Sequence, residues 1–342
     1  MRWLTASMLL SLLMAVFVAT ELQRRWELPL AVPAEGFPLT VEQGDSLRSV
    51  VRDLNDAGVV QHPLLLLAYG RWSGLDAKMK RGEYHLPRDL TGKTLLLFLQ
   101  RGEVIEYQVT LPEGITLATA LEILAGAEAL ETVLSGENDE RLLALASPHT
   151  SPEGLFFPDS YRYVRGDTDW SILQRAYAQM HKILQEAWAR RARDSAVTTP
   201  YEALIMASII ERETGLPAER GEISGVFTRR MRRGMLLQTD PTVIYGLGRE
   251  FDGNLRRVHL VDGDNPYNTY VIRGLPPTPI ALPGRESILA ALNPEAGDTL
   301  YFVARGDGGH VFSETLSQHN RAVRNYQLRR ARDYRSSPEG SQ

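Results

Sequence analysis

The sequence predicts an α+β protein with a single N-terminal transmembrane helix, a small α/β subdomain and a larger mixed α+β domain. Three observations predict this. An uncharged apolar run opens the chain, and short strand patterns then alternate with capped helices up to about residue 125. Long helical patterns follow, and the C-terminal third is rich in Gly, Pro, Asn and Tyr. At 342 residues the chain is long enough for two or three domains.

The first element is a predicted membrane anchor. The run from Trp3 to Thr20 carries no charge, and as a helix it would span about 27 Å, close to the roughly 30 Å hydrocarbon core of a bilayer. A cleaved signal peptide is the alternative. Its apolar region would be shorter and would end in an Ala-x-Ala-like site, whereas Phe17 occupies the minus-three position of the candidate site at Ala19. We therefore expect an uncleaved, single-pass anchor over residues 1–20.

The charges beside this run do not decide its orientation. Arg2 precedes it, and Arg24 and Arg25 follow it. A very short N-terminal flank before a long chain favours a cytoplasmic N-terminus, with the bulk of the protein outside the cytoplasm. The proline-containing residues 21–38 are predicted to form a stalk.

The small subdomain is predicted over residues 39–125. Its expected elements are a strand at 39–41, a helix that Ser46 caps and Gly58 ends, a strand at 84–86, a helix from Thr91 to Leu99, and a strand at 104–111. Residues 40–54 align weakly with residues 110–124, and each copy reads as strand, glycine turn and capped helix. Two explanations stay open. Any β–turn–α unit has this pattern, or the stretch from Val41 to Leu47 resembles the opening of a LysM module, which would bind glycans containing N-acetylglucosamine.

The larger domain is predicted over residues 126–328, and a polar basic tail over 329–342. Its expected elements are a helix and polar loop in 126–150, a long helix at 169–193, a helix from Thr199-Pro200 to Gly215, strands near 299–304 and 311–312, and an arginine-rich helix at 317–335. From residue 237 onward we otherwise expect turns and loops, including a rigid, proline-rich loop wall at 274–284.

Composition excludes several classes of function. The 38 Lys and Arg against 42 Asp and Glu residues give a net charge of -4, which argues against a general nucleic-acid binder. The absence of cysteine excludes disulfides, iron–sulfur clusters and thiol nucleophiles. The histidines have no zinc-binding spacing, and no Walker, GxSxG or GxGxxG motif occurs. We therefore expect neither a metal nor a cofactor.

The candidate catalytic group lies at the end of the helix at 201–214. This helix is apolar on nearly all sides and should be buried, so a carboxylate in its last turn should be desolvated, which raises a carboxyl pKa toward the range of a general acid. Glu211 and Glu213 are two residues apart and cannot face the same site. The smaller side chains one turn before Glu211 give it a slight preference. The alternative is a helix-end salt bridge with Arg212 or Arg220.

Two further segments, residues 237–246 and 264–270, combine aromatic rings with amide and carboxyl groups. This combination suits a sugar-binding groove. The alternative for each segment is a structured turn. The candidate substrate-binding residues are Gln238, Thr239, Asp240, Tyr245, Tyr267, Asn268 and Tyr270, together with Glu153 from an aromatic, proline-bounded turn at 151–163.

Six blocks of this sequence resemble the YceG-like (MltG) family of endolytic murein transglycosylases. They are SPEGLFFPDSY, ASIIERETG, LQTDPTVIYG, NPYNTY, GLPPTPIALPG and LYFVARGDGGHVFSETLSQHN. The resemblance implies a bacterial protein of the cytoplasmic (inner) membrane, with a cytoplasmic N-terminus, a LysM-like subdomain and a periplasmic or extracytoplasmic catalytic domain. It also implies peptidoglycan glycan strands as substrate and peptidoglycan synthases (penicillin-binding proteins) as partners. Thr278 stands where relatives have Gly.

The resemblance further implies that Glu211 is the catalytic acid, and a reaction that needs one carboxylate. Glu211 would protonate the oxygen of the β-1,4 bond between N-acetylmuramic acid and N-acetylglucosamine, then take the proton of the muramyl C6 hydroxyl as a 1,6-anhydro end forms. Two alternatives remain. A hydrolytic muramidase would need a second carboxylate, for which Asp240 and Glu219 are candidates. A non-catalytic peptidoglycan-binding scaffold would need neither.

Overall fold

The structure is a computed structural model that describes residues 2–327. The chain divides into two compact units. Unit 1 contains residues 1–108, 128–131 and 162–168, and unit 2 contains residues 109–127, 132–161 and 169–342. The division falls at residue 108, where we expected a boundary at 125, so the second copy of the weak repeat belongs to unit 2.

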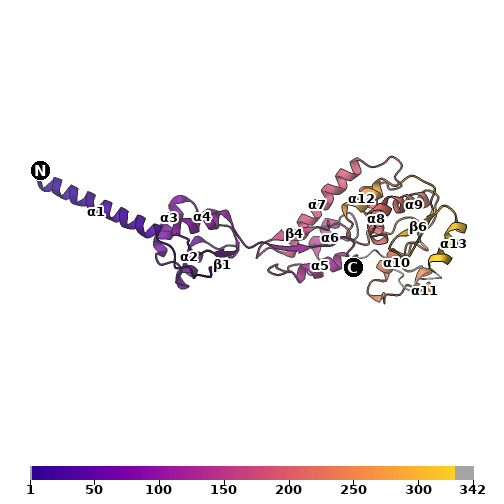
Figure 1. The fold of residues 1–342 in the computed structure, drawn as a ribbon, viewed down its shortest axis with the longest axis horizontal. Coiled ribbons are helices and arrows are strands. Elements are labelled where there is room, and N and C mark those ends of the chain that lie inside the picture. The colour runs from indigo at the N-terminus through magenta and orange to yellow at the C-terminus, as the bar shows by residue number, and fades with distance from the viewer. Residues whose placement is uncertain (1, 328–342) are drawn as a thin grey trace. The chain divides into compact units, whose positions relative to one another are not determined.

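Unit 1 is a small α/β unit with one hairpin-like sheet. Its elements are α1 (Arg2–Glu27), β1 (Phe37–Val41), α2 (Leu47–Asp56), α3 (Pro63–Ser73), a 3-10 turn (Asp76–Lys78), β2 (Gly82–Leu86) and α4 (Gly92–Arg101) (Figure 1). Strand β1 pairs with β2 antiparallel, and Leu39 lies opposite Tyr84. Helices α2 and α4 both begin with a capping box, at Ser46 and Thr91. These four elements confirm the predicted ones; α3 was not predicted.

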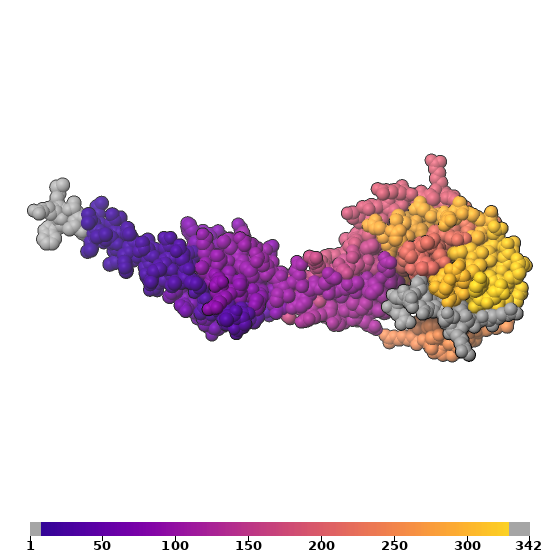
Figure 2. Space-filling view, viewed as in Figure 1, coloured from indigo at the N-terminus to yellow at the C-terminus, as the bar shows by residue number. Residues whose placement is uncertain are grey.

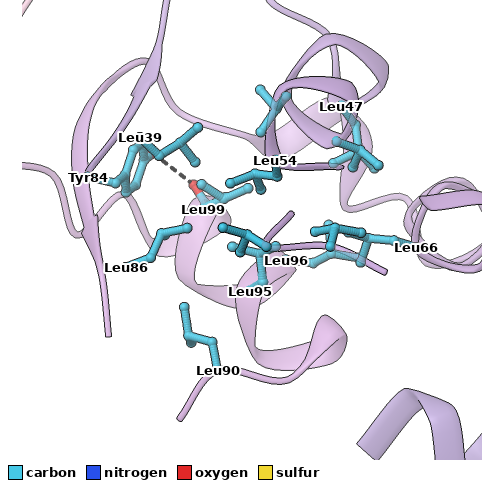
Figure 3. Close-up of a cluster of buried hydrophobic side chains, with 14 of the residues drawn as sticks. Leu39, Leu47, Leu54, Leu66, Tyr84, Leu86, Leu90, Leu95, Leu96 and Leu99 are labelled. Carbon is cyan, nitrogen blue, oxygen red and sulfur yellow. Dashed lines mark hydrogen bonds between the residues drawn. The ribbon is translucent and has the colours of Figure 1, made fainter. Parts of the chain in front are cut away.

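One hydrophobic cluster holds unit 1 together. Leu54, Tyr84, Leu86 and Leu95 are fully buried in it, and they come from α2, β2 and α4 (Figure 3). The Tyr84 hydroxyl donates to the backbone oxygens of Lys80 and Leu99, at 2.6 Å and 3.2 Å. Unit 1 therefore has a core of its own.

The predicted stalk is not a free segment. Helix α1 continues past Thr20 to Glu27, and the next residues pack on the core. The Leu30 N–H donates to the Leu90 oxygen at 2.7 Å, and Val32 is 7% exposed. Apolar side chains bury themselves wherever a neighbouring core offers contact, which the proline content alone did not indicate.

The first part of α1 exposes its apolar side chains. Exposed fractions range from 79% at Met8 to 47% at Val18, and Figure 2 shows this stretch in indigo at the surface. Among the described residues, no helix meets the combined requirements of length and apolarity for a membrane span.

Unit 2 is mainly helical. Its elements are α5 (Leu117–Ala125), α6 (Glu140–Ala146), α7 (Asp169–Ala189), α8 (Pro200–Glu213), α9 (Arg220–Arg232), α10 (Asp240–Leu247), α11 (Arg257–Leu260), α12 (Arg285–Leu292) and α13 (Leu316–Tyr326), with 3-10 turns at Pro217–Glu219 and Gly248–Glu250. Strands β5 (Tyr301–Ala304) and β6 (His310–Ser313) form an antiparallel pair. The strands β3 (Tyr107–Thr110) and β4 (Ser160–Tyr163) also pair, and the division of the chain runs through both.

Helix α8 is the centre of unit 2. It contacts α7, α9, α10 and α12 (Figure 1), and every residue from Ala203 to Ile210 is buried. Thr199 caps its N-terminus by accepting a hydrogen bond from the Glu202 N–H. The prediction of a buried, all-round apolar helix with this cap is confirmed. Its last turn presents charged residues at the edge of the core.

Several segments expected as turns are helices. Helix α10 begins at Asp240, and Pro241 occupies its first turn, where a proline costs no hydrogen bond. Helices α9 and α12 were not predicted, because both mix charged, small and apolar residues without a clear helical period. With 13 and 8 residues, they depend on packing against α8 for their stability. Helix α13 confirms the start of the predicted C-terminal helix. The rest of that prediction, beyond residue 327, lies outside the described residues, as does the predicted tail.

Candidate active site

The Glu211 carboxylate lies in the last turn of α8 and is almost fully enclosed. Its side chain is 6% exposed. Its Oε1 accepts a hydrogen bond from Arg220 Nη2 at 3.1 Å, and its Oε2 accepts from the Gly284 N–H at 2.8 Å. Arg220 opens α9 and Gly284 precedes α12, so two helix starts meet at this carboxylate. The salt bridge to Arg220 that we considered as an alternative is present, but it is buried, and burying a charge pair costs desolvation energy that a surface pair does not.

A second carboxylate, Glu113, lies near the same guanidinium nitrogen of Arg220. Its Oε2 is 3.8 Å from Arg220 Nη2. Burial raises the pKa of Glu113, and the negative charge of Glu211 raises it further. We did not predict Glu113 from the sequence. The weak repeat contained a sequence signal for it. Glu113 comes directly before the turn glycine Gly114 of the second copy, where the first copy has the neutral Gln43 before Gly44.

The segment 278–284 forms the wall beside these carboxylates. As predicted, it contains neither helix nor strand. It is held by the Gly114 N–H donating to the Leu282 oxygen and by the Ile280 N–H donating to Ser208 Oγ at 3.0 Å. Ser208 belongs to α8, so the wall is tied to the helix that carries Glu211. This connection fixes the Gly284 N–H in front of the carboxylate.

Gly284 also lies directly against Glu113. A Cβ at this glycine would be 1.9 Å from Glu113 Oε1. Only a residue without a side chain allows the Glu113 carboxylate to take this position. Gly284 therefore contacts both acidic side chains, Glu211 through its N–H and Glu113 through its bare Cα.

Glu213 belongs to a different group of residues. Thr239 Oγ1 donates a hydrogen bond to Glu213 Oε1, and burial raises the pKa of Glu213 to about 7. The Thr239 N–H in turn donates to Thr269 Oγ1 at 3.0 Å. The two glutamates of α8 thus have separate partners, in agreement with their positions on opposite sides of the helix.

Two predicted groove residues lie next to Thr239 in the chain. Asp240 is exposed and accepts a hydrogen bond from the Tyr270 hydroxyl at 2.6 Å. Gln238 is also exposed, and its N–H donates to the Thr269 oxygen. Its φ of 52° is left-handed, which is uncommon for a residue with a side chain. Gln238 and Asp240 are therefore the members of the predicted set that solvent reaches most freely.

Glu153 forms a third group with two tyrosines. It is 2% exposed and accepts hydrogen bonds from the Leu117 N–H and the Tyr245 hydroxyl, at 3.0 Å and 3.3 Å. Burial raises the pKa of Glu153 to about 7. The Tyr245 ring meets the Tyr267 ring edge-on at 4.9 Å. Glu153 thus ties the start of α5 to α10 from inside the unit.

The Tyr267 hydroxyl bonds to Thr278 Oγ1 at 2.8 Å. The threonine at this position of the proline-rich loop therefore gives the loop an anchor that glycine would lack. Asn268 is fully buried, and its amide donates to the backbone oxygens of His259 and Asp262. Its side chain stabilises the loop and does not face solvent, contrary to the expected groove position.

The residues considered as a second carboxylate differ in availability. Both oxygens of Glu219 bond to His310, one to its N–H and one to Nδ1, each at 2.8 Å. Asp240 is exposed but belongs to the Glu213 group. Glu113 is the carboxylate that shares a partner with Glu211. Across residues 2–327, no group of three or more His, Asp and Glu side chains has the arrangement of a metal site.

Comparison with known proteins assigns the family. The model of the YceG-like family matches residues 39–325, and the chain belongs to this family. The chain is 31% identical over 310 residues to an endolytic murein transglycosylase of Bacillus subtilis (strain 168), with 84% of each chain covered. It is 29% identical over 316 residues to an endolytic murein transglycosylase of Streptococcus pneumoniae serotype 2, covering 83% of this chain and 57% of that protein.

A solved structure shares the fold. The crystal structure of a YceG-like protein from Listeria monocytogenes superposes with a TM-score of 0.53 at 25% identity, covering 84% of this chain and 99% of that one. The resemblance inferred from the six sequence blocks is therefore confirmed.

Proposed function

We propose that this protein is an endolytic peptidoglycan lytic transglycosylase that cleaves the bond between N-acetylmuramic acid and N-acetylglucosamine within nascent glycan strands. The observation that carries the proposal is the enclosed Glu211 carboxylate on the buried helix α8, in a chain of the YceG-like family whose named relatives are endolytic murein transglycosylases. A carboxyl group in such a setting can deliver a proton to a glycosidic oxygen.

Glu211 performs both proton transfers in this mechanism. As the acid it protonates the glycosidic oxygen, and the bond from that oxygen to muramyl C1 breaks. The resulting carboxylate then takes the proton of the C6 hydroxyl, whose oxygen bonds to C1 and closes the 1,6-anhydro ring. No water is consumed, and Glu211 regains its proton. Arg220 and the Gly284 N–H are placed to stabilise the carboxylate between the two steps.

The sugar-contacting surface is proposed from the exposed and half-buried predicted residues. Gln238 and Asp240 offer amide and carboxyl groups to solvent, and Tyr245, Tyr267 and Tyr270 are half-buried. Hydroxyl groups and N-acetyl groups of sugars are recognised by such polar groups, and their rings stack on aromatic faces. Thr239, Asn268 and Glu153 support this surface from beneath.

We also propose that unit 1 contains the LysM-like subdomain and that α1 anchors the chain in the cytoplasmic membrane as a single span. The exposed apolar side chains from Met8 to Val18 support the anchor, since water disfavours such a surface. The active unit then lies outside the cytoplasm, where nascent glycan strands and the peptidoglycan synthases that extend them are found. Ending those strands is the role we assign to the protein.

Replacing Glu211 by Gln tests the function. The full chain in detergent is incubated with uncrosslinked glycan strands, and new ends are read by mass spectrometry. We expect 1,6-anhydro ends with the parent and a loss of activity of at least about 100-fold with Glu211→Gln, the scale typical of a removed general acid. Glu122→Gln, at an exposed position of α5, is the matched control and should retain full activity.

Each other outcome has a definite meaning. Reducing ends would replace the proposal by a hydrolytic muramidase, for which Glu113 beside Arg220 is the candidate base. Absence of cleavage by a parent chain that still binds glycan strands, with the same binding in Glu211→Gln, would replace it by a non-catalytic scaffold.

A further inference from the structure

One guanidinium serves two carboxylates in this site. Arg220 Nη2 lies 3.1 Å from Glu211 Oε1 and 3.8 Å from Glu113 Oε2. The Glu211 side chain is 6% exposed and the Glu113 side chain is 48% exposed, so water can replace the arginine at Glu113 but hardly at Glu211. The arrangement therefore has a surplus of one negative charge when both glutamates are ionised.

This arrangement creates a difficulty for a general acid. A cation beside a carboxyl group favours its ionised form, whereas the reaction starts from the protonated form. The Gly284 N–H points at Oε2, so the proton has to reside on Oε1, the oxygen that Arg220 contacts. An arginine held permanently at Oε1 would oppose the first step of the reaction.

We propose that Glu113 is a positioning residue that draws the Arg220 guanidinium away from Glu211 while Glu211 carries its proton, and returns it when Glu211 becomes a carboxylate. This inference rests on the proposed function. Glu113 acts through Arg220 and takes no part in bond making. A movement of the shared Nη2 group from one oxygen to the other, both already within ion-pair distance, is sufficient.

The other charged groups around Glu113 are compatible with this role. Glu211 faces it from α8, Arg220 from α9 and Glu286 from α12, and the two glutamates raise the pKa of Glu113 while Arg220 lowers it. The Arg212 guanidinium is engaged with the Gly114 oxygen at 3.0 Å. Arg220 is thus the cation for which Glu113 and Glu211 compete.

The pH profile of cleavage tests the proposal. In Glu113→Gln, the Arg220 guanidinium remains beside Glu211, and the negative charge of Glu113 is lost. Both changes favour the ionised form of Glu211 over the protonated form that starts the reaction. We expect kcat to fall about 10-fold at pH 7 with little change in KM, and the alkaline limb of the kcat profile to move about one unit to lower pH. Glu113→Asp, which keeps the charge, should restore the limb in part, and Glu122→Gln should leave it unchanged.

Gly284→Ala gives a second variant that keeps both carboxylates. Its φ of -75° is acceptable for alanine, so the backbone is not strained. The new Cβ instead displaces the end of the flexible Glu113 side chain from its place beside Arg220. We expect the alkaline limb to move in the same direction as in Glu113→Gln. A uniform loss of activity at all pH values in both variants would assign Glu113 a merely structural role and overturn the proposal.

A measurement of unfolding separates this inference from the reaction. Because the folded-state pKa of Glu113 is raised, its stabilising contribution is complete at low pH and is lost as pH rises through that value. The Tm of Glu113→Gln relative to the parent should therefore increase from pH 4 to pH 7, and this increase should shrink in a Glu211→Gln background. An increase that is unaffected by Glu211→Gln overturns the coupling, whether or not the parent cleaves glycans.

Discussion

Two buried carboxyl groups, Glu213 and Glu153, stand out among the described residues of unit 2. The pKa of Glu213 and that of Glu153 are each raised to about 7 by burial. The sequence predicted such an effect for a carboxyl in the last turn of α8, and Glu213 shows it. The hydrogen bond from the neutral Thr239 hydroxyl lowers the pKa of Glu213 less than burial raises it.

The stability of the protein should depend on the protonation of Glu213. A folded-state pKa near 7, above the ordinary value of 4.5, means that Glu213 stabilises the fold at low pH and that this contribution is lost as pH rises from about 5 to 8. The full effect is at most about 3 kcal/mol. Glu213→Gln does not titrate, so its Tm relative to the parent should increase from pH 5 to pH 8.5. A constant difference, like that expected for Glu122→Gln, would contradict this.

Among the elements, α8 organises the site through its contact with the wall segment 278–284. Its apolar surface on every side could be predicted from its sequence alone. The polar Ser208 within that surface could not be interpreted, because its partner, the Ile280 N–H, is far away in the chain. A buried hydroxyl that satisfies a backbone donor stabilises the fold most when nothing else can replace it.

Ser208→Ala should loosen the wall. It leaves the Ile280 N–H buried without its acceptor, at a cost of about 1–3 kcal/mol in the free energy of unfolding. It should also lower kcat several-fold, because the same segment holds the Gly284 N–H against Glu211. The Tm measures the loss of stability, and the cleavage rate measures the fall in kcat.

Ser287→Ala is the matched control for this change. The Ser287 hydroxyl is buried with no hydrogen-bond partner among the described residues, so its removal should cost little. Equal losses in the two variants would show that the Ile280 hydrogen bond is not responsible.

For the whole molecule, the chain forms two units, and the first of them begins with a helix whose apolar side chains are exposed. The boundary between the units could not be predicted correctly, because the strand–turn–helix of 109–125 has the same local pattern as its counterpart in unit 1. Its residues nevertheless serve unit 2, where the Glu113 carboxylate lies near Arg220 and the Leu117 N–H donates to Glu153. Local pattern identifies an element but not the core to which it contributes.

The proposed anchor gives a prediction at this scale. The full chain should sediment with membranes and be released by detergent, whereas a chain lacking residues 1–20 should remain in the supernatant, because the exposed apolar surface of α1 is what a bilayer would cover. The truncated chain retains Trp26, which packs on the unit 1 core. Sedimentation of both chains alike would contradict anchoring by α1.

The sequence by itself determined the α+β class, the capped helices, the buried helix α8 and the family blocks, because each depends on residues that are neighbours in the chain. Tertiary structure decided what the end of α8 does. Glu211, Arg220, Gly284 and Glu113 come from four segments, and their hydrogen bonds and charges depend on distances that no local pattern contains. Helices α9 and α12 were likewise decided by packing on α8, which supplies the stability that short helices lack in isolation.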